Sequence, residues 1–430
     1  MAPSLGDRTV LAAAGLGAMT LAVGLGVEFT GRQLGTPNPP FNEFWAPRAE
    51  LGWALLAVGV LVATVWALPR LTRGPRHPVA FAAVLTALAL AVRLAVAAAR
   101  HGPEGWYRVL DPALSFEGAN EYLPALGATE AGPGFLLDRF AEMVPALPVH
   151  AAGHPPGLLL VLAALGITTP QGMAALCVGV GVLAAPATYA LGRALLPDEQ
   201  RARVAGALFV LAPSAVLVGA VSADALFATL GTLAAALLCA RGLAARAAGA
   251  LALGVASLFS WALLALGAFA VLALWAREGL LRAVATGAGC AGALLAVHGG
   301  LWALAGWDPI GTVRATERVY RLGIATIRPY WFWAFGSPVA FAVGAGLPVT
   351  AWALRALAGR RAPALALAAV VLVAAVAGFT KGEVERIWVI FVPPLCVAAA
   401  SALPPRRLGL VAALLAVQAL GAELLFESLW

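Results

Sequence analysis

Long apolar stretches alternate with short polar connections along almost the whole chain. A helix needs about 20 predominantly apolar residues to cross a membrane, and many of these stretches approach or reach that length. We expect membrane-spanning helices at residues 9–28, 49–69, 79–99, 171–193, 203–221, 224–240, 247–260, 262–276, 283–304, 335–354, 363–379, 387–403 and 408–426. The pattern predicts an all-α, polytopic transmembrane helical bundle of about 13 spans. The pair within residues 247–276 is short, and a tight hairpin around Ser260 and Trp261 is the alternative.

The longest polar stretch, residues 104–157, separates the third expected span from the fourth. It holds seven acids and two histidines, which are Glu104, Asp111, Glu117, Glu121, Glu130, Asp138, Glu142, His150 and His154. The apolar run that follows, residues 157–165, is too short to cross a membrane. We therefore predict a large loop that carries short interfacial or re-entrant helices. Pro155 and Pro156 suit the start of one of them, because proline is tolerated in the first turn of a helix.

Arginine is concentrated in connections that alternate along the chain. These connections are residues 69–77, 193–203, 241–246, 277–282, 355–361 and 404–407. Cytoplasmic connections of membrane proteins carry an excess of basic residues, so we predict that this set is cytoplasmic and that the acidic loop is extracytoplasmic. Lys381 is the only lysine, a bias typical of a high-GC genome. The prediction is a multi-pass protein of a bacterial plasma membrane.

Composition agrees with a membrane protein. The chain is 62% hydrophobic and 11% charged, whereas soluble domains carry about 25% charged residues. We treat residues 1–430 as a single integral membrane domain. No Walker motif, dinucleotide-binding glycine pattern or HExxH motif is convincing, so neither a soluble nucleotide site nor a nucleic-acid partner is expected. The four cysteines lie in apolar runs without metal-binding spacing and are expected to be core residues.

The first candidate chemistry lies in the acidic loop. Glu117 and Glu121 are spaced i, i+4, so both carboxylates share one face if this segment is helical. Two carboxylates at a membrane interface can take the raised pKa values that a general base needs. The alternative is a solvated helix with ordinary surface acids. Asp111 precedes Pro112 and favours the start of a turn.

Two histidines close the loop in the segment HAAGHPPG, residues 150–157. His150 and His154 are four residues apart, a spacing that can ligate a metal on a helix. Gly153 and Pro155 argue against a helix across this segment, so that geometry would be lost. Hydrogen bonding within the site or to a lipid phosphate is one alternative, and a purely structural role is another.

A later outer loop, residues 307–336, carries an unusual amount of positive charge for that side of the membrane. Arg314, Arg318 and Arg321 are spaced i, i+4, i+7 on one face of a predicted helix. Arginine suits a phosphate ligand, so this face predicts an anionic substrate. The alternative is that these arginines pair with Glu317, Asp308 and lipid headgroups.

Two shorter outer segments add charged candidates. Four charges, Lys381, Glu383, Glu385 and Arg386, stand within six residues of a short loop before a helix that Pro393-Pro394 should break. Charges at the edge of a span usually anchor it, but this density favours a place in a cavity wall. Asp224 stands in a tight turn before an expected span, where it could also be only a helix cap.

Taken together, these segments resemble the C-type glycosyltransferase (GT-C) superfamily, polytopic enzymes that use polyprenyl-phosphate-linked sugars. The resemblance spans residues 79–403. The third expected span carries Arg93 and runs into an acidic outer loop, as in the family. The family motifs are similar to NEYL (120–123), GHPPG (153–157), PSAVLVGAVSADALF (213–227) and ERIWVIFVPPL (385–395). Asn120 stands where the family often has Asp, which leaves the base open between Glu121 and Glu117.

The resemblance implies an inverting transfer of a mannose-like sugar or a pentose from a polyprenyl phosphate to an extracytoplasmic glycolipid, polysaccharide or protein. One of the two glutamates would deprotonate the acceptor, and the arginines and Lys381 would hold the phosphate. The scheme needs no cofactor and does not require a divalent metal. The catalytic core would be residues 79–403 with its loop at 100–157, preceded by two extra spans (1–78) and followed by a last span with a short outer tail (404–430). The alternative function is a transporter or flippase of a lipid-linked or anionic substrate.

Overall fold

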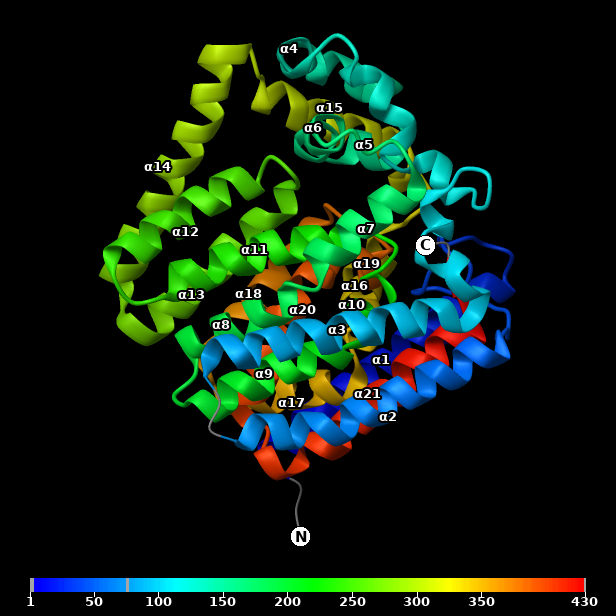
Figure 1. Cartoon of the computed structure of the whole chain (residues 1–430), viewed down its shortest axis with the longest axis vertical. Helices are drawn as coiled ribbons and strands as arrows, with labels where there is room; N and C mark the ends of the chain where they lie inside the picture. The colour runs from blue at the N-terminus through cyan, green and yellow to red at the C-terminus, as the bar shows by residue number, and fades with distance from the viewer. Residues whose placement is uncertain (1–3, 75–76, 429–430) are drawn as a thin grey trace.

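The computed structural model describes residues 4–74 and 77–428, which form a bundle of helices (Figure 1). The long N-terminal helices are α1 (Leu5–Phe29), α2 (Leu51–Arg73) and α3 (Pro78–His101). Within the described residues, eight helices are long and apolar enough to cross a membrane, or nine if one bent pair counts as a span. The chain is therefore an all-α, multi-pass membrane protein.

The acidic loop folds into short helices that lie together at the top of Figure 1. After several 3₁₀ turns it forms α4 (Pro133–Met143), α5 (Val149–Gly153) and α6 (Gly157–Ala164). The sequence predicted short helices in this loop, and α6 begins directly after Pro155-Pro156, as expected. A later helix, α15 (Pro309–Leu322), packs against this group through its contacts with α4 and α5.

The middle of the chain supplies the helices beneath the loop. They are α7 (Pro170–Gly181), α8 (Ala184–Leu195), α9 (Glu199–Leu211), α10 (Pro213–Leu217), α11 (Asp224–Cys239), α12 (Leu243–Ala256), α13 (Leu264–Glu278) and α14 (Leu280–Ala305). The C-terminal part adds α16 (Tyr330–Gly344), α17 (Leu347–Ala358), α18 (Ala362–Ala377), α19 (Val384–Ile387), α20 (Val392–Ala402) and α21 (Leu408–Leu425).

Burial shows which of these helices form the core. In the segment Val384–Ala402, which contains α19 and α20, 94% of the 18-residue apolar stretch is buried inside the protein. In α1 only 11% of the corresponding stretch is buried. The helix α20 contacts α8, α9, α17 and α18 on different sides. A helix that is apolar all round and covered all round is a core helix, whereas α1 presents its side chains to lipid.

Several expected spans are bent or broken, so the expectation of about 13 straight spans is not confirmed. The expected span 335–354 is two helices, α16 and α17, at an angle of 114°. Gly346 forms the bend with a φ of +117°, and a Cβ there would come within 2.5 Å of Leu415. Similarly, the expected span 203–221 divides at Pro213, which has no N–H to continue the helix of the preceding residues.

The contacts of two arginines, Arg277 and Arg328, agree with the predicted division of the connections into a cytoplasmic and an outer group. Arg277 donates to the carbonyl oxygen of Ala194, in a connection predicted to be cytoplasmic, and to that of Cys239, at the end of the span that leads into another such connection. On the other side, Arg328 donates to the carbonyl oxygens of Gly35 and Lys381, which belong to connections predicted to be outer. This separation agrees with the arginine distribution. The expected inner residue Arg76 lies outside the described part.

A two-stranded antiparallel sheet joins the ends of the chain. Residues Glu43–Trp45 form β1, and Phe426–Ser428 form β2, with Phe44 opposite Glu427. The loop between α1 and α2 is thereby fixed to the C-terminal end of α21. The two extra N-terminal spans and the last span are therefore connected on the same side of the protein as the acidic loop.

Candidate functional site

The segment that holds Glu117 and Glu121 is not the α-helix that their spacing suggested. Glu117–Asn120 is a single 3₁₀ turn, and Glu121 follows it in extended conformation. Gly118 allows this turn to lie on the preceding turn at Asp111, because a Cβ at Gly118 would come within 2.4 Å of the Asp111 carbonyl carbon. The two carboxylates are brought together by a common partner and not by a helix face.

That common partner is His150. Its Nε2 lies 2.5 Å from Oε1 of Glu117 and 3.9 Å from Oε1 of Glu121. The other oxygen of Glu117 accepts a hydrogen bond from the Asn120 side chain at 3.3 Å. His150 lies within α5, but this helix ends at Gly153, so no helix continues to His154, as Gly153 and Pro155 indicated. The two histidines therefore do not share a helix face.

A second set of charges adjoins His150 from the far end of the chain. Arg386, on α19, donates through Nη1 to Asp224 at 3.1 Å and through Nη2 to Glu383 at 3.3 Å. Arg328 approaches the other oxygen of Glu383 at 2.5 Å. Nη1 of Arg386 also lies 3.4 Å from Nδ1 of His150, which links the two sets. We name Glu117, Glu121, His150, Asp224, Arg328, Glu383 and Arg386 the acidic cluster.

The members of the acidic cluster are largely removed from water. The exposed fraction is 2% for Glu121, 4% for Arg386 and 5% for Asp224. The cluster reaches solvent through Glu117 and Glu383, whose side chains are 13% and 19% exposed. Buried charges are stable only when they are paired, and here the guanidinium of Arg386 is shared between two carboxylates.

The surroundings shift the pKa values of the two loop glutamates in opposite directions. Burial raises the pKa of the Glu121 carboxyl, and this effect outweighs the attraction of His150 and Arg386. Burial also opposes ionisation of Glu117 and is the largest single effect there, but the hydrogen bond from His150 and the charges of His150 and Arg386 together outweigh it, so the pKa of Glu117 is lowered. An environment that separates the pKa values of two neighbouring carboxyls gives them different chemical roles.

Three polar atoms around Glu121 have no hydrogen-bond partner within residues 4–74 and 77–428. They are Oε2 of Glu121, the hydroxyl of the adjacent Tyr122 and Nδ1 of His154, all of them buried. The rings of Tyr122 and His154 stack with centroids 6.3 Å apart, and the ring of Phe227 also lies against His154, with centroids 5.2 Å apart. Buried polar groups in proteins are nearly always satisfied, so a group of unsatisfied atoms beside a charged cluster indicates a place for a ligand.

The arginine face of α15 lies elsewhere. Arg314, Arg318 and Arg321 are exposed, and Arg321 pairs with Glu317 at 2.7 Å, as the alternative interpretation allowed. The opposite face of α15 contacts the loop, where Thr316 donates to the carbonyl oxygen of Ala152. The structure therefore does not bring Arg314 and Arg318 into the acidic cluster.

Lys381 lies between the acidic cluster and α15. Its Nζ donates to the carbonyl oxygen of Ala325 at 3.0 Å, and it forms no ion pair within the described part of the chain. Its pKa is lowered by burial and by the positive charges of Arg328 and Arg321. A lysine held near two arginines without a carboxylate partner is an attractive position for an anion.

The structure adds residues that the sequence did not indicate. Arg328 follows the α15 arginines, but its spacing does not place it on their face. Its role comes from a contact with Glu383, 55 positions away. Tyr122 belongs to NEYL, and the sequence could have suggested it. Asp111 is a turn residue, as predicted, since its carboxylate accepts from the Ala113 N–H at 2.9 Å.

The described residues contain no group of three or more histidine, cysteine, aspartate or glutamate side chains arranged to hold a metal ion. All four cysteines are buried and free, as core residues should be. No protein-family model, curated protein or solved structure matches the chain.

Proposed function

We propose that the protein is a membrane glycosyltransferase that moves a sugar from a polyprenyl phosphate to an acceptor hydroxyl on the extracytoplasmic side. The observation that carries this proposal is Glu121, a buried carboxyl with a raised pKa and an oxygen without a partner, next to His150. A free carboxylate oxygen with these properties is suited to take a proton. The order of the motifs along the chain, which resembles GT-C enzymes, supports the same reaction class.

Glu121 is the base in this scheme. Its Oε2 accepts the proton of the acceptor hydroxyl while the acceptor oxygen forms a bond to the anomeric carbon. The bond between that carbon and the phosphate oxygen breaks, and its electron pair leaves with the polyprenyl phosphate. Attack from the face opposite the leaving group inverts the anomeric configuration.

Glu117 is a positioning residue in this scheme. It holds His150 through the contact of 2.5 Å, and its negative charge helps to keep the pKa of Glu121 high.

The role of Glu117 predicts a shift in the pH profile. The base must be ionised, so the rate falls as the pH drops through the pKa of Glu121. Replacing Glu117 with Gln removes a neighbouring negative charge that raises this pKa. We expect Glu117→Gln to reduce the rate and to move the acidic limb of its pH profile to lower pH. A reduced rate with an unmoved acidic limb would contradict the electrostatic role of Glu117.

The leaving phosphate needs positive charge that the acidic cluster does not already use. Arg386 and Arg328 face Asp224 and Glu383, so Lys381 is the better phosphate ligand, with Arg321 beside it. The polyprenyl tail would lie among the apolar helices while the phosphate rests at the interface. A cation near the leaving oxygen stabilises the charge that develops there.

Replacement of Lys381 tests this assignment. Hydrogen bonds to charged groups contribute about 1.5–3 kcal/mol, so Lys381→Met should raise the KM for the polyprenyl-phosphate sugar by about 10–100-fold. The KM for the acceptor should change little. The measurement is sugar transfer by the purified protein in nanodiscs, with Arg139→Gln as the control because Arg139 is an exposed arginine on α4 of the acidic loop. An unchanged donor KM would remove Lys381 from the phosphate site.

A further inference from the structure

A cavity lies beside α19, apart from the acidic cluster. Its volume is about 400 Å³, within the usual range for small-molecule sites. Glu385 of α19 lines this cavity, although the next residue, Arg386, belongs to the acidic cluster. The remaining walls come from the loop before β1, the end of α3 and the turns after it, α10 and the residues after it, the bend between α16 and α17, the end of α21 and β2. The cavity therefore joins residues of the range 79–403 to both ends of the chain.

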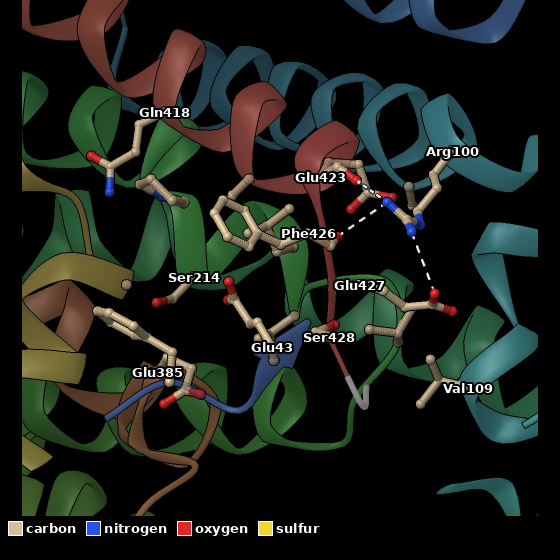
Figure 2. Close-up of a pocket in the computed structure, with 18 of the residues that line it drawn as sticks. Glu43, Arg100, Val109, Ser214, Glu385, Gln418, Glu423, Phe426, Glu427 and Ser428 are labelled. Atoms are coloured by element: carbon tan, nitrogen blue, oxygen red, sulfur yellow. Dashed lines mark hydrogen bonds and ion pairs between the residues drawn. The ribbon is translucent and has the colours of Figure 1, made fainter. Parts of the chain in front are cut away.

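Acidic side chains from three separate segments line this cavity. They are Glu43 of β1, Glu385 of α19 and Glu423 of α21. Figure 2 shows Glu43, Ser214 and Glu385 near one another, while Arg100 and Glu427 lie at the other end. Glu43 is close enough to repel both of the other acids. Within the described chain, none of the three forms an ion pair.

Two buried polar atoms at this end of the cavity lack partners. Glu385, 6% exposed, accepts a hydrogen bond from the Asn42 N–H through Oε1, but its Oε2 has no partner. The hydroxyl of Ser214, 3% exposed, also has none. Gly344 lies against both, since a Cβ there would come within 3.1 Å of the Ser214 oxygen. Unsatisfied acceptors that line one cavity from different helices indicate a missing donor.

The nearest arginine does not neutralise these acids. Arg100 donates to the carbonyl oxygens of Ala46 at 2.6 Å and Phe426 at 3.2 Å, and it pairs with the carboxylate of Glu427 at 3.4 Å. These contacts fix β2 to α3, and the charge of Arg100 acts on Glu423. Glu43 and Glu385 form no ion pair within the described chain, so a bound cation would balance their charge when they are ionised.

We propose that this cavity binds a small amphipathic ligand through a protonated amine. The carboxylates of Glu43 and Glu385 and the hydroxyl of Ser214 would accept the three N–H bonds of the ammonium group. The apolar part of the ligand would contact Phe41, Val218 and Leu347, which line the same cavity. Burial raises the pKa of the Glu43 carboxyl to about 7, so a bound cation would favour its ionised form. The amine belongs either to a lipid headgroup, such as ethanolamine, or to a soluble molecule.

The test compares an amine with a matched alcohol. The full-length protein in detergent micelles is titrated with octylamine and with octanol, and binding is measured by isothermal titration calorimetry. We expect saturable binding of octylamine and at least tenfold weaker binding of octanol, which differs only in the charged group. This comparison needs no variant, so a failure of a variant to fold does not affect it. Equal binding of the two probes would overturn the proposal.

Variants then locate the amine. Glu43→Gln and Glu385→Gln should each weaken octylamine binding at least tenfold, while Glu142→Gln, a change at an exposed acid on α4, should leave it unchanged. Wild-type binding in the double variant Glu43→Gln/Glu385→Gln would contradict the site. Competition by dihexanoyl phosphatidylethanolamine, but not by the corresponding phosphatidylglycerol, would assign the amine to a lipid headgroup. Octylamine binding without such competition would assign it to a soluble amine. Neither result depends on sugar transfer, so the glycosyltransferase proposal stands or fails separately.

Discussion

Glu121→Gln should abolish sugar transfer while the protein still folds. Loss of a general base costs about 10²–10⁴ in rate, and Gln keeps the shape of the side chain without the ability to take a proton. The fold should persist because Glu121 is 2% exposed and its Oε2 has no partner to lose. The change loses only the 3.9 Å contact of Oε1 with His150 and relieves the desolvation cost of a buried carboxylate, so the thermal midpoint should be equal or higher.

The control for this experiment is Glu142→Gln. Glu142 lies in the same outer loop, on α4, with a side chain that is 70% exposed and paired only with Arg139. Both variants change one carboxylate to an amide, so only the position differs. Transfer at the wild-type rate by Glu121→Gln would exclude Glu121 as the base.

Arg386→Leu should give the largest loss of stability of any single change in the acidic cluster. Arg386 is 4% exposed and faces Asp224, Glu383 and His150. Its removal leaves buried carboxylates without their counter-charge, and the loss of one partner of a buried ion pair costs about 3–5 kcal/mol. We expect a clear fall in the thermal midpoint of the purified protein in detergent. The thermal midpoint of Arg386→Lys should lie between those of the wild type and Arg386→Leu, because a single ammonium cannot reproduce the forked contacts of a guanidinium.

A double variant distinguishes this explanation from a simple packing defect. Asp224→Asn combined with Arg386→Leu removes both charges of the pair, so the combined loss should be smaller than the sum of the two single losses. Arg139→Gln is the matched surface control, since exposed pairs contribute about 0–1 kcal/mol. Additive losses for Asp224 and Arg386 would show that the two residues do not stabilise one another.

The sequence predicted the helices better than their shapes. Apolar stretches of suitable length located the long helices such as α1, α2, α3, α14 and α21, because lipid demands both an apolar surface and satisfied backbone groups. The bends were harder to foresee. Gly346 turns the chain because Leu415 leaves no room for a side chain there. Such a contact between distant segments does not appear in a local pattern.

The acidic cluster illustrates the same limit. Glu117, Glu121, His150, Asp224, Glu383 and Arg386 were candidates from local signals, namely charges at the outer ends of apolar stretches. The spacing of Glu117 and Glu121 suggested a shared helix face, but the shared partner is His150, about 30 positions away. Arg314 and Arg318 had an equally clear pattern and lie outside the cluster. The pattern could not decide whether the arginine face or its opposite face packs against the loop.

The most direct test of the proposed function is mass spectrometry of the source organism's envelope glycans and polyprenyl-phosphate sugars, with and without the gene. We expect deletion to remove one sugar from a glycan and to cause a polyprenyl-phosphate sugar to accumulate. The wild-type gene and Glu142→Gln should restore both, and Glu121→Gln should restore neither although the protein is present in the membrane. A transporter would instead change the distribution of a substrate across the membrane without dependence on this carboxylate. Unchanged glycans and unchanged polyprenyl-phosphate sugars after deletion, or full restoration by Glu121→Gln, would contradict the assignment.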